Sequence, residues 1–175
     1  MREQLAGVSL PNDAIGWTRE VTGTIVVEPN GAIVASQSRF RVNLQTLASD
    51  QSRRDNFLRS NTLESSRYPY AEFVPTLATG LAVLPQSGEV TFKPTGDLTI
   101  RNVTKQVAWD VTGQVQGNQA TLQAKTNFTF AHFNLTQPRV PVVLSIEDNI
   151  RLEMDLQLRP GGDVQLCSEH SIARS

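Results

Sequence analysis

Apolar and polar residues alternate along most of the chain with a period of two. The segments 40–44, 90–92, 107–111, 122–130 and 150–158 place apolar residues at every second position, with Thr126 as the one exception. Successive side chains of a β-strand point to opposite faces, so each segment has one apolar face and one polar face. The pattern predicts antiparallel strands, because parallel strands are usually buried on both faces.

Turn-forming residues separate these segments. Gly or Asn occurs within 29–31, 86–88, 95–97 and 117–118, and both residues tolerate the positive φ angles of tight hairpins. The turns divide the chain into about eight or nine strands with mostly short connections, which predicts a β-sandwich or a β-barrel.

One stretch, residues 49–59, lacks the alternation and predicts a short helix. Asp50 stands where a capping side chain can accept hydrogen bonds from the first helical turn. Phe57 and Leu58 form a small apolar patch that would cap one end of a barrel. Pro69 ends the irregular segment, since the residue before a proline avoids the helical conformation. The expected architecture is therefore all-β with one short helix.

The composition fits one globular domain. The chain has 175 residues, of which 39% are hydrophobic and 19% charged, and a formal net charge of −1. The electrostatic field of the whole protein therefore does not favour binding to nucleic acid or to an anionic membrane. No apolar run approaches the ~20 residues of a membrane helix. Pro160-Gly161-Gly162 ends the last strand, which places a barrel domain at residues 1–160 and a flexible tail at 161–175.

Residues that could support catalysis are scarce. The chain has one cysteine, Cys167, which excludes an intrachain disulfide, and two histidines, His132 and His170. Cys167 and His170 have the spacing of metal ligands, but a structural zinc site takes four ligands. The carboxylates show no paired spacing that would separate two pKa values. We therefore expect no catalytic residue, metal or cofactor, and we interpret His132 as a loop or capping residue.

The apolar strand faces allow two interpretations. Apolar residues on every strand usually form a packed core. Eight antiparallel strands closed into a barrel can instead leave an interior that holds one ligand. Strands of about nine to eleven residues would make such a tube about 30 Å long, at about 3.3 Å per residue. A long apolar tube suits a chain-like hydrocarbon, whereas a filled barrel suits an interaction module.

Several ordered motifs resemble the YceI-like lipid-binding family. Residues 38–59 look like its strand that leads into a helix with an Arg-Asp pair and a Leu. The segment YPYAEF at 68–73 is similar to its Tyr-Pro…Phe strand. The segment GDLTIRNVTKQV at 96–107 is similar to its Gly-x-Leu-Thr…Val-Thr-Lys-x-Val region. The pair of segments 133–135 and 148–152 resembles its final hairpin.

The resemblance extends over most of the chain, from Thr22 to Leu158. It implies an eight-stranded antiparallel barrel of extended lipocalin type, with a hydrophobic lumen for polyisoprenoids or related amphiphilic lipids. It also implies a bacterial protein in the periplasm or elsewhere outside the cytoplasm, so that a signal or anchor is expected to precede Met1. No catalytic residues come with the resemblance. Many members have His-Gly where this chain has Arg101-Asn102, which changes any polar contact near that turn.

The alternating apolar positions supply the candidate ligand-binding residues. These are Phe40, Val42, Phe57, Leu58, Phe73, Phe92, Leu98, Ile100, Trp109, Phe128, Phe130, Leu152, Met154 and Leu156. Arg53 and Arg54 are the candidates for binding a lipid head group, because guanidinium groups suit phosphate and carboxylate. Their neighbours Asp50 and Asp55 support a competing interpretation, in which these charges form surface ion pairs of small energetic value.

The leading hypothesis is non-enzymatic binding and carriage of a long-chain lipid inside the barrel. The lipid would be a polyisoprenoid, an isoprenoid quinone or a fatty amphiphile. The main alternative is a ligand-free, filled barrel that acts as an envelope interaction or stress-response module. An enzyme that modifies lipid through His132 and a small outer-membrane barrel are weaker alternatives, and a homodimer is left open. Ala124→Phe is expected to block the lumen and abolish lipid binding while the fold survives.

Overall fold

The computed structural model describes residues 2–5, 12–81, 83, 85–137, 143–146, 148–159, 165–166 and 173–174. The strands are β1 (Arg2–Leu5), β2 (Asn12–Asp13), β3 (Ile15–Trp17), β4 (Val21–Thr24), β5 (Arg39–Asn43), β6 (Ala48–Ser49), β7 (Tyr70–Thr79), β8 (Ser87–Ile100), β9 (Val103–Ala108), β10 (Asp110–Gln116), β11 (Gln119–Phe128), β12 (Val143–Ile146), β13 (Ile150–Leu158), β14 (Gln165–Leu166) and β15 (Ala173–Arg174). The helical elements are α1 (Ser52–Phe57), the π-helical turn η3 (Leu58–Thr62) and the 3-10 turns η1 (Ala35–Gln37), η2 (Leu44–Thr46) and η4 (Ala131–Phe133).

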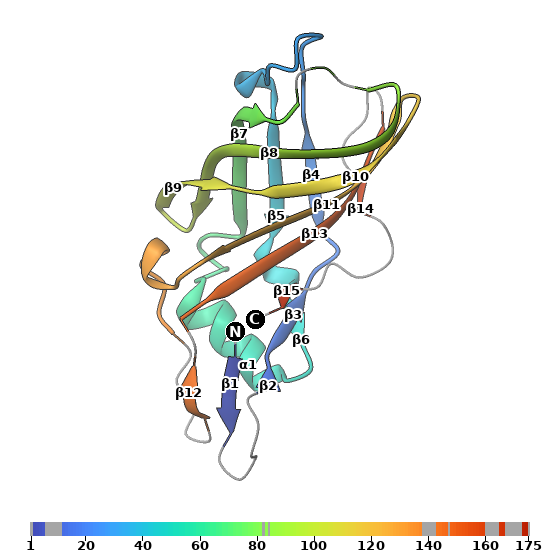
Figure 1. The fold of residues 1–175 in the computed structure, drawn as a ribbon. Helices are drawn as coiled ribbons and strands as arrows, with labels where there is room; N and C mark the ends of the chain where they lie inside the picture. Colours follow the sequence, from blue (N-terminus) through green and yellow to red (C-terminus); the bar gives the residue numbers. More distant parts are fainter. Residues whose placement is uncertain are drawn as a thin grey trace.

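One large antiparallel sheet dominates the molecule. Its strand order is β14-β13-β11-β10-β8-β7-β5-β4, and β9 also pairs with β8. The sheet curls into a partly closed barrel (Figure 1), and its end strands β14 and β4 lie in contact. Two small sheets, β12-β1-β2 and β15-β3-β6, lie at the end of the barrel where α1 packs against β6. The prediction of an all-β antiparallel fold with one short helix is confirmed.

The alternation predicts which side chains face the barrel interior. Val107 of β9, Val111 of β10 and Trp109 between these strands are all buried. These strands follow one course along β8, and Trp109 lies at the break between them. The Trp109 backbone N–H donates to the Pro94 carbonyl oxygen at 2.9 Å. This bond keeps the period-two alternation in register across the break.

The prediction of a turn at residues 95–97 is wrong, because these residues lie within the long strand β8. Gly96 stands opposite Pro75 of β7, where the pairing register shifts. A β-carbon at Gly96 would overlap the Val74 carbonyl oxygen and lie 2.6 Å from the Pro75 α-carbon. The glycine therefore allows two strands to approach closely, a second common role of glycine in a strand.

The predicted helix is present but begins differently. The residue that precedes α1 is Gln51, and no side chain caps the first turn. Asp50 instead accepts a hydrogen bond from Arg54 Nη1 at 2.6 Å. A bond to a charged guanidinium is about twice as strong as one between neutral groups, so the Asp50 carboxylate pairs with Arg54 and does not cap the helix. The prediction of Asp50 as the cap is wrong.

Two short strands occur within residues 161–175. β14 pairs with β13, and β15 pairs with β3. Cys167 and His170 lie outside the described residues. Among those that are described, no cluster of three or more His, Cys, Asp or Glu residues could hold a metal ion. Within the same part of the chain, no helix has the length and apolar character needed to span a bilayer.

Candidate ligand-binding cavity

An apolar cavity of about 220 Å³ lies inside the barrel at the end covered by α1. Strands β5, β7, β8, β11 and β13 supply its barrel wall, and β3, β6 and α1 supply the opposite wall. Most of its lining atoms are carbon. An apolar cavity of about 150 Å³ is large enough to admit benzene, so this space can hold part of a hydrocarbon chain.

Most of the residues predicted to contact a ligand surround this cavity. They are Phe40, Val42, Leu58, Phe73, Leu98, Ile100, Trp109, Phe128, Phe130, Leu152 and Met154. Phe57, Phe92 and Leu156 are not part of the lining. Phe57 is half-buried on α1, whereas Phe92 and Leu156 belong to the packed core. For all of them, contact with a ligand stays a prediction.

The cavity is confined to one end of the barrel. Toward the other end, Val90, Val111, Val115 and Leu122 fill the interior, and Ala124 is buried among the same core residues. None of these five residues lines the cavity. The tube of about 30 Å that the strand lengths allow is therefore not formed, and the barrel is part packed core and part cavity.

Several lining residues were not predicted from the sequence. They include Ala14, Trp17, Val21, Leu44, Leu47, Ser49, Asp55, Thr62, Leu63, Ala71 and Leu135. Leu44 continues the alternation of Phe40 and Val42, whereas Leu47 and Leu63 belong to irregular segments. A period-two pattern does not detect such residues, because their side-chain directions follow from turns and not from the pleat of a strand. Ala71 carried a usable signal, since it alternates with Phe73 on the inner face of β7.

A small polar cluster lies in the wall beside α1. The Ser49 hydroxyl donates to Asp55 Oδ1 at 2.5 Å, and Arg54 Nη1 lies 3.4 Å from the same hydroxyl oxygen. Asp55 is 8% exposed, and all three residues line the cavity. The cluster forms because β6 places Ser49 directly before α1, whose first turn carries Arg54 and Asp55 back toward it.

The structure separates the two predicted head-group residues. Arg54 lines the cavity and its side chain is largely buried. Arg53 is exposed and does not belong to the lining. Arg54 already bonds Asp50 and Ser49, so a ligand would have to share or replace these partners. The arrangement favours the ion-pair interpretation for Arg54, and a head-group role for either arginine stays a prediction.

Ser49→Ala is expected to lower the free energy of unfolding by about 1–3 kcal/mol, because it removes a hydrogen-bond donor from a buried carboxylate. Urea denaturation measures the change. Ser52→Ala is the matched control, since Ser52 is exposed at the start of α1 and surface changes usually stay within about 0.5 kcal/mol. Equal effects of the two variants would contradict a structural role for the Ser49–Asp55 bond.

Arg101 lies at the turn where the resemblance found in the sequence implies a His-Gly pair. It adopts a left-handed conformation with φ of 57° at the turn from β8 to β9. Its side chain forms an ion pair with Glu64, and Nη1 donates to the Thr62 carbonyl oxygen at 3.5 Å. Arg101 is not part of the cavity lining. In this chain the turn therefore stabilises η3, whose last residue, Thr62, lines the cavity.

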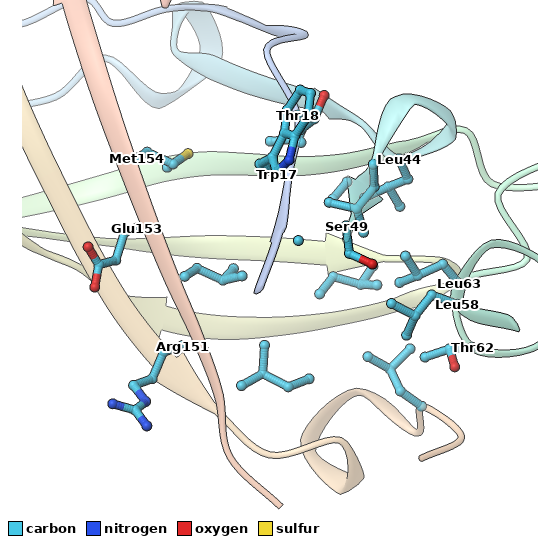
Figure 2. Close-up of a pocket in the computed structure, with 18 of the residues that line it drawn as sticks. Trp17, Thr18, Leu44, Ser49, Leu58, Thr62, Leu63, Arg151, Glu153 and Met154 are labelled. Carbon is cyan, nitrogen blue, oxygen red and sulfur yellow. The ribbon is translucent and has the colours of Figure 1, made fainter. Parts of the chain in front are cut away.

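Exposure along the lining shows where the cavity opens. Trp17 of β3 is 47% exposed, and Arg151 and Glu153 of β13 are half-buried. In Figure 2 the charged ends of Arg151 and Glu153 point away from the cluster that contains Leu58. Trp109, in contrast, is only 3% exposed. The most exposed part of the lining, here called the mouth, is therefore at Trp17, Arg151 and Glu153, beside β15, which packs against both β3 and β13. Trp109 belongs to the closed part of the wall.

Comparisons with known proteins agree with this architecture. Residues 6–158 match the YceI-like domain family, whereas no curated protein matches the chain. The YceI protein of Campylobacter jejuni has a TM-score of 0.66 at 14% identity, over 91% of each chain. BcnA of Burkholderia cenocepacia has a TM-score of 0.63 at 15% identity, over 83% of this chain and 95% of that one.

A third similar structure is described as a polyisoprenoid-binding domain from Saccharophagus degradans, implicated in plant cell wall breakdown. Its TM-score is 0.58 at 10% identity, over 95% of this chain and 98% of that one. At such identities the structures establish a shared fold. The family match covers nearly all of the barrel, from before β2 to the end of β13. This chain belongs to the YceI-like family.

Proposed function

We propose that the protein binds a long-chain apolar molecule in the barrel cavity and carries it without chemical change. A polyisoprenoid, an isoprenoid quinone and a fatty amphiphile all have a chain that suits the cavity. The observation that carries the proposal is the nearly all-carbon lining of a 220 Å³ space that opens beside Trp17. The polyisoprenoid-binding description of the Saccharophagus neighbour gives independent support for a lipid ligand.

The energetics favour a chain that is only partly enclosed. Each buried methylene contributes about 0.8 kcal/mol, and costs of association reduce the total. A segment of chain inside the cavity can still give useful affinity, while the remainder and any head group stay near the mouth. Long chains would otherwise have to displace the packed side chains at the other end of the barrel.

The lipid-modifying alternative lacks a structural basis at His132. This residue is exposed in η4, where its ring lies edge-on to Phe133 at 5.1 Å between ring centroids. It does not line the cavity. Carriage is therefore the better proposal. The location outside the cytoplasm stays a prediction.

Native mass spectrometry of the purified protein, followed by solvent extraction, tests the proposed function. We expect a stoichiometric adduct whose extracted component is a long-chain lipid, or uptake of added farnesol or palmitate by protein that is purified empty. A bare polypeptide mass that stays unchanged with either probe would contradict the proposal. That result would favour the alternative of an interaction module, to be pursued by a search for protein partners.

A further inference from the structure

Arg151 of β13 lies at the mouth of the cavity and has no protein partner among the described residues. Its side chain forms neither an ion pair nor a hydrogen bond with any of them. The residue is half-buried, with Nε enclosed in the wall and the two Nη groups still open to solvent. A guanidinium that loses part of its hydration usually gains acceptors from the protein. The two Nη groups can therefore take an acceptor from a ligand.

Arg151 also connects the apolar cavity with a polar pocket. Residues 151–153 of β13 line both spaces. The polar pocket, of about 520 Å³, lies over the outer face of β11 and β13, where Asn127 stands opposite Arg151. β13 pairs with β11 along its whole length, whereas its other edge pairs, as far as the structure describes it, only near its C-terminal end. A chain that leaves the cavity past residues 151–153 would bring its end to Arg151, whose charged end points away from the apolar lining (Figure 2).

The other charged groups that line the polar pocket are already paired. Lys125 Nζ lies 3.7 Å from Glu153 Oε2, and Asp110 Oδ1 lies 2.9 Å from Lys93 Nζ. Each pair is close to neutral overall. Arg151 thus supplies the one uncompensated charge among the described residues that line this pocket. The local field is positive, which favours an anion at this side of the mouth.

Two amides of the same pocket add neutral hydrogen-bond donors. Asn127 and Asn149 line it, and neither side chain has a hydrogen-bond partner in the described part of the chain. An asparagine amide can donate two hydrogen bonds. One free positive charge with neutral donors suits a singly charged anion. The nearby carboxylates of Glu153 and Asp110 would repel the additional charges of a diphosphate.

We propose that Arg151 binds the carboxylate of a fatty acid whose chain occupies the cavity. This inference rests on the proposed function and narrows its ligand class to apolar chains that end in a singly charged carboxylate. The two Nη groups would donate to the two carboxylate oxygens, a pairing that guanidinium geometry favours. The head group would keep part of its hydration at the mouth, which limits the cost of desolvating its charge.

Two probes with the same chain separate head-group recognition from chain binding. Laurate and 1-dodecanol differ in their head group, and calorimetric titration at pH 8 gives the affinity of each. We expect Arg151→Gln to lower the ratio of laurate affinity to dodecanol affinity about tenfold, the lower end of the range for hydrogen bonds to charged groups. Arg159→Gln is the matched control and should leave the ratio unchanged, because exposed Arg159 follows the same strand and lines neither space.

The carboxyl group of the bound ligand gives a second, direct measurement. Laurate labelled with carbon-13 at its carboxyl carbon reports its own ionisation by nuclear magnetic resonance. A tenfold preference for the anion corresponds to one pKa unit. The carboxyl pKa of bound laurate should therefore be about one unit lower in the wild-type protein than in Arg151→Gln. A merely structural role of Arg151 would change both affinities and leave this pKa where it was.

The wild-type protein alone decides the matter if Arg151→Gln does not fold. We expect nuclear Overhauser contacts between the laurate methylene group next to the carboxylate and the δ-protons of Arg151. Their absence from a saturated complex would overturn the inference. Acetate that saturates the same site at the concentrations used for laurate would indicate a site for small anions and would also overturn it.

The outcomes distinguish this inference from the proposed function. An unchanged affinity ratio and an unchanged carboxyl pKa in Arg151→Gln would overturn the role of Arg151 and leave chain binding intact. An equal loss of the ratio in Arg159→Gln would show a general effect of charge and overturn it as well. Failure of both probes to bind the wild-type protein would contradict the proposed function itself.

Discussion

Ala71→Phe is expected to abolish ligand binding while the barrel stays folded. Ala71 faces the cavity from β7, opposite Val42 of β5, which also lines it. A phenyl ring is the size of benzene, which fits a cavity of about 150 Å³, so the new side chain would take up most of the 220 Å³ available. Added farnesol should no longer give an adduct in native mass spectrometry, and the melting temperature should change little.

Ala124→Phe is the matched control for this substitution. Ala124 is 4% exposed and faces the same interior, but it lies in the packed part of the barrel and not in the cavity lining. Overpacking usually costs about 1–3 kcal/mol and sometimes more, so this variant should be much less stable than Ala71→Phe. If Ala71→Phe bound lipid normally, or if it unfolded as readily as Ala124→Phe, the assignment of the cavity would be wrong.

The two alanines show how far the sequence predicts the site. Period-two alternation placed Ala124 in the barrel interior and could have placed Ala71 there as well, because the pleat of a strand fixes the side-chain direction. It does not predict that one faces empty space and the other faces packed neighbours. That difference depends on how α1, β3 and β6 cover one end of the barrel, which involves contacts between distant parts of the chain. Because alternation cannot distinguish the packed part from the cavity, the sequence analysis chose Ala124 as the position where a larger side chain would block the lumen.

The helical segment shows a second limit. Its position was predictable from the loss of alternation. The sequence did not predict that Arg54 lines the cavity and Arg53 is exposed. Neighbouring helical residues lie about 100° apart around the axis, so one register decides which of them reaches the cavity. In this chain Arg54 lies on the side of α1 that lines the cavity, and Arg53 lies on the exposed side.

Gly96 was interpreted from the sequence as a turn residue, because glycine and a neighbouring aspartate are typical of turns. The structure assigns it a different role within β8, opposite Pro75, where the pairing register shifts. Pro75 is among the most deeply buried residues of the protein. The two strands can approach only where one of them has no side chain, and this contact helps to shape the curled sheet that surrounds the cavity.

Gly96→Ala is therefore expected to destabilise the protein by about 3 kcal/mol or more, at the upper end of the usual cost of overpacking. The added methyl group would meet the Val74 carbonyl oxygen and the Pro75 backbone, neither of which can turn aside as a flexible side chain could. A domain of this size should lose about 2–4 °C in melting temperature for each kcal/mol. Thermal and urea denaturation both measure the effect.

Gly16→Ala provides the control, because a β-carbon at Gly16 would meet the Ala48 carbonyl oxygen at 3.5 Å, an ordinary contact. Replacing glycine by alanine at a compatible position stabilises a protein by about 0.4–1 kcal/mol, since it restricts the unfolded chain. The free energy of unfolding is therefore expected to fall in Gly96→Ala and to rise in Gly16→Ala. A loss below about 1 kcal/mol for Gly96→Ala would mean that β7 and β8 can separate locally. The close contact at Pro75 would then not be needed to maintain the curvature of the sheet.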